Sequence, residues 1–502
     1  MTVGGWTMAS RILGFVRDIM IGAFLGSSAV AEAFLIAFSL PNMFRRFFAE
    51  GTLNVAFVPM FAKKHEGQEG ALEFARDAFS GLAFILVIFS IIAQIFMPAL
   101  VYAMASGFTV DDRFDLAVTY GRIAFPYILF ISLAALLSGV LNATGRFVAA
   151  AAAPVLLNVI FIAAMLGADL MGIDIGTALA WTVPVAGVAQ VALVWVAASR
   201  AGYRLIPRVP HMTPELKRLA IIAAPAALAG GVVQINLLVG RQVASFFDGA
   251  VAWLNYADRL YQLPLGVVGI AIGVVLLPDL SRRLRAGDTT GGQNAFNRAC
   301  EITLALTIPA AVALMIIPVQ LVSVLFERGA FDSADTQATA MALRMFAFGL
   351  PAFVLIKVLT PAFFARENTK TPMIYAGLSA IINLGLGYIL FLKYGFWGLA
   401  IATSVAGWVN VFFLTRTLLR TGGFAPDKRL LTRLPRILLA SIVMGGAVWW
   451  LADTFTHRLD GSIVQNYLWL VLVSGAGLVL YALAALALRA YGLNDLRLAL
   501  GK

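Results

Sequence analysis

The 502-residue chain has one cysteine, Cys300, so a framework of disulfides within the chain is excluded. Charged residues make up only 13% of the sequence and hydrophobic residues 61%, which lies far outside the range of soluble globular proteins. Polar stretches are no longer than loops, which excludes a separate soluble domain. The pattern G-x-x-x-x-G-K-[ST] is missing, so ATP hydrolysis by a P-loop is excluded.

Signs of catalysis and of metal binding are also missing. The three histidines, His65, His211 and His457, lie in predicted loops or at span ends, without the spacing of metal ligands. No serine–histidine pair or paired carboxylates indicate an active site. We therefore expect neither an enzyme nor a bound metal or cofactor. The first apolar segment has no basic region before it and is interrupted by charges, so we expect it to be retained and not cleaved as a signal peptide.

What the sequence does contain is a series of long apolar runs. Residues 81–105, for example, are long enough to cross a bilayer, which takes about 20 apolar residues per helix. We predict an all-α polytopic membrane protein with fourteen helices. They are expected near residues 4–26, 29–62, 78–105, 114–141, 147–167, 177–198, 219–246, 251–281, 299–326, 336–365, 372–392, 396–415, 437–452 and 464–488. Because residues 29–62 contain Pro41 and Pro59, we expect that segment to be broken or kinked.

The distribution of lysine and arginine predicts the orientation in the membrane. If the N-terminus is cytoplasmic, the cytoplasmic loops and tail hold 24 basic residues. The opposite loops hold four: Arg113, Arg328, Lys393 and Arg458. This asymmetry follows the positive-inside rule, so both termini are predicted to be cytoplasmic. The net charge of +11 is then explained by topology and by contact with anionic lipids, and nucleic acid is not an expected partner.

The sequence also shows signs of an internal duplication. Residues 176–183, GTALAWTV, resemble residues 398–405, GLAIATSV, and Leu-Pro occurs in both the second and the eighth predicted helix. Six helices separate the matched segments, so the two copies have the same orientation in the membrane. We therefore predict two six-helix lobes related by a parallel repeat, residues 1–200 and 201–422, followed by a third region, residues 423–502. Chance similarity between apolar segments is the alternative.

Several charged residues lie within the predicted helices. In the first helix, Arg11 and Asp18 share one stripe and Arg17 lies at its edge. In the second, Glu32, Arg46 and Glu50 would align along a continuous helix, with Arg45 off that line, and the eighth contains Asp258 beside Arg259. Charge at the bilayer centre costs about 2.5–3.5 kcal/mol, so such residues usually face a cavity or a partner.

Two explanations of these charges remain open. Arg17–Asp18, Arg46–Glu50 and Asp258–Arg259 could each be a structural ion pair between helices. However, the first two helices contain four arginines against three carboxylates. The surplus predicts an anionic ligand, and the planar guanidinium fork suits phosphate or carboxylate. Four further basic residues lie near span ends, where their side chains are expected to reach the interface: Arg122, Arg241, Arg344 and Lys357.

Three segments together resemble one family. SRILGFVRD at 10–18, FSLPNMFRRFFAEGTLNVAFVPMFA at 38–62 and YADRLYQLPLGVVGIAIGVVLLPDLS at 256–281 are similar to the MurJ (MviN) lipid II flippases. These belong to the multidrug/oligosaccharidyl-lipid/polysaccharide exporter superfamily, and the similarity covers essentially the whole chain. The resemblance implies two lobes that alternate between inward-open and outward-open states. It also implies that the last two helices, within residues 423–502, form a groove for the lipid tail.

The resemblance further implies roles for individual residues. Arg11, Arg17, Arg45 and Arg259 correspond to cavity arginines that bind substrate, and Asp18, Glu32 and Glu50 match acidic positions of the family. Arg46 and Asp258 are grouped with these as cavity or gating charges. The expected partners are lipid II and membrane lipids, in the bacterial inner membrane, for peptidoglycan synthesis and cell shape. A flippase for another polyprenyl-pyrophosphate glycan, a cation-coupled drug exporter and a non-transporting scaffold are the alternatives.

Overall fold

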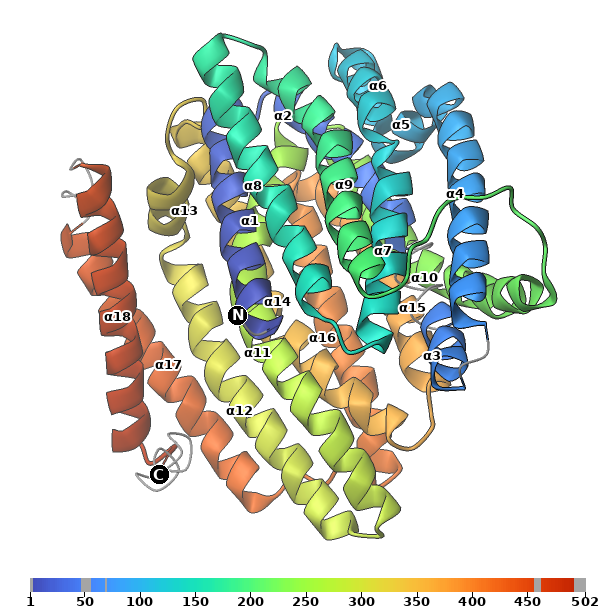
Figure 1. The fold of residues 1–502 in the computed structure, drawn as a ribbon. Helices are drawn as coiled ribbons and strands as arrows, with labels where there is room; N and C mark the ends of the chain where they lie inside the picture. Colours follow the sequence, from blue (N-terminus) through green and yellow to red (C-terminus); the bar gives the residue numbers. More distant parts are fainter. Residues whose placement is uncertain (1–2, 47–55, 68–69, 456–461, 492–502) are drawn as a thin grey trace. The chain divides into compact units, whose positions relative to one another are not determined.

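A computed structural model of the chain describes residues 3–46, 56–67, 70–455 and 462–491, without the side chains of residues 224–237, 267–278, 281, 284 and 285. Within these residues the fold is helical, apart from one isolated bridge between Arg328 and Phe331. This confirms the predicted all-α class (Figure 1). Ten of the described helical segments are long and apolar enough to cross a membrane. The number fourteen stays a prediction.

The helices overlap the predicted segments, although the helices that begin at Thr289 and Lys428 start ten and nine residues earlier than expected. In chain order the helices are α1 (Val3–Leu25), α2 (Ala29–Arg45), α3 (Val58–Glu66), α4 (Ala71–Ile95), α5 (Met97–Ala105), the 3-10 helix η2 (Ser106–Val110), α6 (Arg113–Ala124), α7 (Tyr127–Ala143), α8 (Val148–Met171), α9 (Ile175–Arg200), α10 (Pro214–Ala244), α11 (Ala250–Arg285), α12 (Thr289–Ile316), α13 (Pro318–Phe326), α14 (Ser333–Phe364), α15 (Lys370–Tyr394), α16 (Trp397–Arg420), α17 (Lys428–Phe455) and α18 (Ile463–Ala487).

Side-chain caps explain several of the helix starts. Asp174 accepts a hydrogen bond from the Thr177 amide at 2.7 Å and so begins α9, while Ser462 and Gln465 form a capping box at the start of α18. These bonds satisfy backbone N–H groups that have no partner in the first helical turn. These helix starts are therefore specified by capping side chains as well as by the change from polar to apolar residues.

Three of the predicted spans each consist of two helices. The breaks fall between α4 and α5, between α6 and α7, and between α12 and α13, next to Pro98, Pro126 and Pro318. Proline lacks the amide hydrogen that would continue the helical ladder. The helix α2 continues past Pro41, and Pro59 lies in the first turn of α3. The predicted break between α2 and α3 falls on residues 47–55, outside the described residues.

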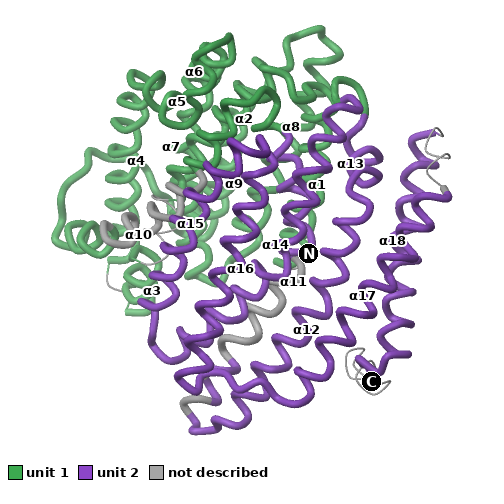
Figure 2. Tube along the Cα trace, turned by 180° about the vertical axis from the view of Figure 1, so that it is seen from behind, with its two compact units in different colours: residues 1–252, 328–331 green, residues 253–327, 332–502 purple. Residues whose placement is uncertain are grey.

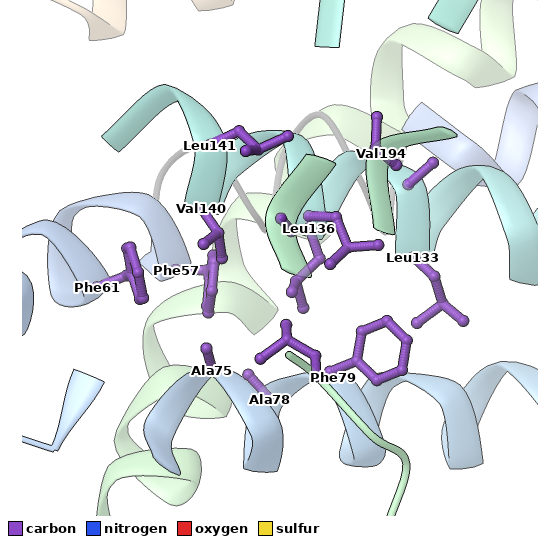
Figure 3. Packing of buried hydrophobic residues seen from close by; sticks show 14 of the residues in the cluster. Phe57, Phe61, Ala75, Ala78, Phe79, Leu133, Leu136, Val140, Leu141 and Val194 are labelled. Atoms are coloured by element: carbon purple, nitrogen blue, oxygen red, sulfur yellow. The ribbon is translucent and has the colours of Figure 1, made fainter. Parts of the chain in front are cut away.

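The chain divides into two compact units (Figure 2). Unit 1 consists of residues 1–252 and 328–331, and unit 2 of residues 253–327 and 332–502. A cluster of buried side chains from α3, α4, α7 and α9 forms a core of unit 1; Figure 3 shows Phe57, Phe79 and Leu136 among them. In unit 2, apolar residues of α12, α14 and α16 form one core, and α12, α17 and α18 share another.

Residues 201–252 group with unit 1 because hydrogen bonds join them to it. The Arg208 amide donates to Ser80 Oγ at 3.0 Å, and the Gly107 amide donates to Ser245 Oγ at 3.0 Å. The two units are defined by contacts in the structure, whereas the predicted lobes are defined by the repeat in the sequence. The lobe boundaries 1–200, 201–422 and 423–502 therefore stay a prediction.

Glycine explains part of the repeated sequence motif. A Cβ on Gly176 would lie 2.3 Å from Val30 of α2, and a Cβ on Gly398 would lie 2.4 Å from the Leu390 carbonyl of α15. Both copies of the motif thus begin at a glycine that permits a close approach between helices.

Candidate functional site

A buried arginine and its carboxylate partner lie in the middle of α1. Arg17 and Asp18 are 7% and 6% exposed, and Arg17 Nη2 lies 2.8 Å from Asp18 Oδ1. Arg17 Nε donates to the same oxygen at 3.1 Å. Arg17 and Asp18 therefore form an ion pair within α1, whereas the structural explanation of these charges expects ion pairs between helices.

The helix α8 completes the surroundings of this pair. Arg17 Nη1 donates to Asn158 Oδ1 at 3.0 Å, and Asn158 Nδ2 donates to the Ser10 carbonyl at 2.9 Å. The Asn158 amide thus ties α8 to α1, whose ribbons run side by side in Figure 1. The guanidinium also lies over two rings, with its Cζ 5.9 Å from the centroid of Phe38 and 5.5 Å from that of Phe161. In this apolar setting each hydrogen bond to the guanidinium is stronger than in water.

The other predicted arginines of unit 1 lie in more open positions. Arg11 is exposed and lies about 1.7 turns before Arg17 on α1. Arg45 is half-buried at the last residue of α2, and Arg46 is exposed directly after it. Both Arg45 and Arg46 have interaction partners. Glu50 lies outside the described residues.

The predicted pair of the eighth segment belongs to unit 2. Asp258 and Arg259 are half-buried on α11, and Asp258 accepts a hydrogen bond from the Gln262 side chain one turn later. Arg259 also has interaction partners. Two of the nine predicted site residues, Arg17 and Asp18, are bonded directly to each other.

Glu32 lies in a second cluster of charges, at the start of α2. Its carboxylate is 1% exposed, accepts a hydrogen bond from Arg113 Nη1 at 2.8 Å, and accepts another from the Val251 amide at 2.9 Å. Arg113 Nη2 lies 2.6 Å from Asp111 Oδ2 and 2.7 Å from Asp248 Oδ1. We call Glu32, Asp111, Arg113 and Asp248 the Arg113 cluster. It joins α2, the start of α6 and the turn between α10 and α11.

Further backbone contacts in unit 1 involve η2, the end of α10 and the end of α1. The Ser106 amide donates to Gln242 Oε1 at 2.9 Å, so η2 is hydrogen-bonded to the end of α10. A Cβ on Gly107 would lie 2.5 Å from the backbone of Ser245, which only glycine permits. The Ala330 amide donates to the Ala23 carbonyl at 2.8 Å, which fastens the turn at residues 328–331 to the end of α1.

The pKa of Asp111 reflects this arrangement. Hydrogen bonds from the Arg113 guanidinium hold the pKa of the Asp111 carboxyl below its ordinary value, because they favour the charged form. Asp111 and Arg113 lie two residues apart in a loop that the sequence places outside the membrane. The cluster is thus partly buried and partly open to water.

Sequence reasoning missed Asn158 and the role of Arg113. Asn158 is a lone amide in the apolar run of α8, and that polar residue was the available signal. Arg113 was placed only as a loop charge, since nothing local shows that it contacts Glu32, 81 positions away.

The fold and these buried ionic groups are those of an all-helical, multi-pass membrane protein, and charges buried within a membrane are typical of the transporter class. Comparison with known proteins places it within that class. The family model described as "Lipid II flippase MurJ" matches residues 21–470, and the chain belongs to this family.

Individual relatives agree over nearly the full length. The chain is 45% identical to the "Probable lipid II flippase MurJ" of Rhizobium meliloti (strain 1021), across 99% of this chain and 94% of that one. It is 35% identical to the "Lipid II flippase MurJ" of Burkholderia cenocepacia, across 91% and 90%.

Solved structures show the same fold. A structure titled "Lipid II flippase MurJ, inward closed conformation" is 25% identical and covers 96% of this chain and 97% of that one, with a TM-score of 0.79. An inward-facing multidrug resistance MATE transporter of the MOP superfamily is 17% identical, with a TM-score of 0.68 over 82% of this chain and 95% of that one. This second likeness supports the fold alone.

Proposed function

We propose that this protein is a lipid II flippase that moves the undecaprenyl-pyrophosphate-linked peptidoglycan precursor from the cytoplasmic to the periplasmic leaflet of the bacterial inner membrane. The observation that carries the proposal is membership of the MurJ family over residues 21–470 together with the buried Arg17–Asp18–Asn158 cluster between α1 and α8. Both termini are cytoplasmic in this proposal, in accord with the distribution of basic residues. Neither ATP nor nucleic acid takes part.

The chemistry of the substrate dictates the mechanism. Moving a polyprenyl tail into water costs about 0.8 kcal/mol for each exposed CH₂, so the tail stays in lipid. Only the pyrophosphate, disaccharide and peptide cross through the protein. The helices α17 and α18, within residues 423–502, are proposed to form the groove for the tail.

We assign the pyrophosphate to the guanidiniums of Arg17, Arg45 and Arg259. Arg17 is already buried against two neighbouring aromatic rings and oriented by Asn158, so its fork is pre-organised. When phosphate oxygens approach, they compete with Asp18 for the Nε and Nη2 donors. Arg11, Asp18, Arg46, Glu50 and Asp258 set the local field.

Alternating access requires that one side be closed while the other is open. In the proposed orientation, the start of α2, the loop at residues 106–112 and the turns at 245–250 and 328–331 all lie on the periplasmic side. The bonds of the Arg113 cluster and the Ala330–Ala23 hydrogen bond support a closed periplasmic side. We therefore assign Glu32 to gating.

The membrane potential can set the direction of transport. Moving negative charge outward from a negative interior is favourable by about 2.3 kcal/mol per charge per 100 mV. The pyrophosphate carries this charge across.

The proposal is tested with lipid II accessibility in cells depleted of other flippases. Arg17→Ala, Arg45→Ala and Arg259→Ala are each expected to lower the externally accessible lipid II severely at normal expression. Arg200→Ala at the cytoplasmic end of α9 is the control and keeps wild-type activity. Full activity in all three cavity variants refutes the assignment, and failure of the wild-type chain to complement a conditional lipid II flippase mutant refutes the function.

A further inference from the structure

Two proline breaks in different units leave backbone carbonyls without their helical donors. The helix α4 ends at Ile95 and α5 begins at Met97, with Pro98 in its first turn. Similarly, α12 ends at Ile316 and α13 begins at Pro318. Pro98 has no amide hydrogen for the Gln94 carbonyl, four residues earlier. At the second break α12 ends at Ile316, before Val319, whose amide would bond to the Met315 carbonyl in a continuous helix.

In each unit, an arginine from the next membrane segment donates a hydrogen bond to this carbonyl. Arg122 Nε donates to the carbonyl of Gln94, the fourth residue before Pro98, at 3.3 Å. Arg344 Nε donates to the carbonyl of Met315, the third residue before Pro318, at 3.0 Å. These guanidiniums therefore have specific acceptors, in addition to lying near the ends of their spans.

The two arginines occupy matching places in the internal duplication. Arg122 and Arg344 are 222 positions apart, and the repeated motif at Gly176 and Gly398 has the same separation. The two short helices also correspond, since α5 and α13 each contain nine residues. The same contact, between an arginine and a carbonyl at a proline break, thus occurs once in each copy of the repeat.

Each short helix leads into a contact of the closed periplasmic side. The chain passes from α5 into η2, where the Ser106 and Gly107 amides donate to side chains of α10. After α13 it enters the turn at residues 328–331, where the Ala330 amide donates to the Ala23 carbonyl. A shift of either short helix would displace the residues that make these bonds.

We propose that Arg122 and Arg344 are positioning residues that cap the proline breaks and thereby hold α5 and α13, the segments that carry the periplasmic closing contacts. The capping rests on the geometry alone, and its link to closure rests on the proposed function. Each arginine acts on the short helix of its own unit.

Hydrogen–deuterium exchange of the purified full chain tests the capping without any substrate. Arg122→Ala is expected to raise amide exchange in residues 97–110 about fivefold, which corresponds to about 1 kcal/mol. Exchange in residues 318–326 stays unchanged. Arg344→Ala is expected to give the opposite pattern, so each variant is the other's control.

Restoring the missing amide gives the decisive comparison. In Pro98→Ala, the new N–H can bond to the Gln94 carbonyl, so Arg122→Ala is expected to have no further effect on exchange in that background. Pro184→Ala, which alters a proline inside α9, is the matched control and leaves the fivefold effect intact.

Three results overturn the proposal: exchange within twofold of wild type in Arg122→Ala, an effect of equal size in the Pro98→Ala background, or an equal rise in both short helices. If Arg122→Ala does not accumulate in membranes, accumulation of the Pro98→Ala, Arg122→Ala variant supports the proposal and its absence overturns it. Because exchange does not depend on lipid II, this test and the transport test can fail separately.

Discussion

Replacing Arg113 with alanine is the sharpest test of the proposed periplasmic closure. Glu32 is 1% exposed and Arg113 4%, so the bond between them is desolvated at both ends. Removing one partner of a buried pair typically costs about 3–5 kcal/mol, because the remaining charge stays buried. The Val251 amide still donates to Glu32, so we expect the lower end, about 3 kcal/mol, or a factor of about 100 in the closing equilibrium.

The exposed partners of Arg113 provide the control. The Asp248 side chain is 91% exposed, and an exposed ion pair contributes less than about 1 kcal/mol. We therefore expect Asp248→Asn to change the closing equilibrium less than about fivefold. The comparison separates loss of the buried pair from loss of any ionic contact to the same guanidinium.

The assay is amide exchange at Val251, whose N–H donates to Glu32, together with lipid II accessibility in cells. Arg113→Ala is expected to raise exchange at Val251 strongly and to lower flipping. The double variant Glu32→Gln, Arg113→Gln removes both charges and should recover part of the lost protection. Equal effects of Arg113→Ala and Asp248→Asn would falsify the reasoning that burial makes this pair important.

Three further predictions concern single positions. Asn158→Ala is expected to lower the free energy of unfolding by about 1–3 kcal/mol, measured by denaturation in detergent, and to reduce flipping, because the buried guanidinium of α1 loses an acceptor. Gly329→Ala should lower the melting temperature more than Gly145→Ala. Both glycines have positive φ, but only at Gly329 would a Cβ collide with a backbone oxygen, at 2.2 Å. Because Arg113 lowers the pKa of Asp111, this pair stabilises the fold at pH values above the ordinary carboxyl pKa. The free energy of unfolding should therefore fall as the pH drops below about 4. Asp111→Asn should weaken that pH dependence.

The positions of the helices were largely predictable, but the breaks within residues 78–105, 114–141 and 299–326 were not. Apolar runs and polar loops locate the segments because a membrane helix must bury its backbone polar groups in its own hydrogen bonds. The break within residues 114–141 shows the limit of that reasoning. Hydrophobicity continues across Pro126, so this segment reads as one span although the structure divides it into α6 and α7.

The charged residues were predictable as a group but not one by one. The local pattern predicts that Arg17 and Asp18 lie on the polar side of α1, and they are indeed paired there. Glu32 was expected along a line with Arg46 and Glu50, yet its direct partner is Arg113. The pattern within one helix does not specify which loop of another segment approaches it.

The sequence alone determined the helical class and predicted the orientation and the duplication, because these depend on composition, charge asymmetry and local period. Only the tertiary structure decided which polar groups meet. Asn158 reaches Arg17 over 141 positions, and Arg344 reaches the Met315 carbonyl at a helix break. Such contacts arise because each buried polar group must find a partner, and the partner is chosen by how the helices pack, not by its distance along the chain.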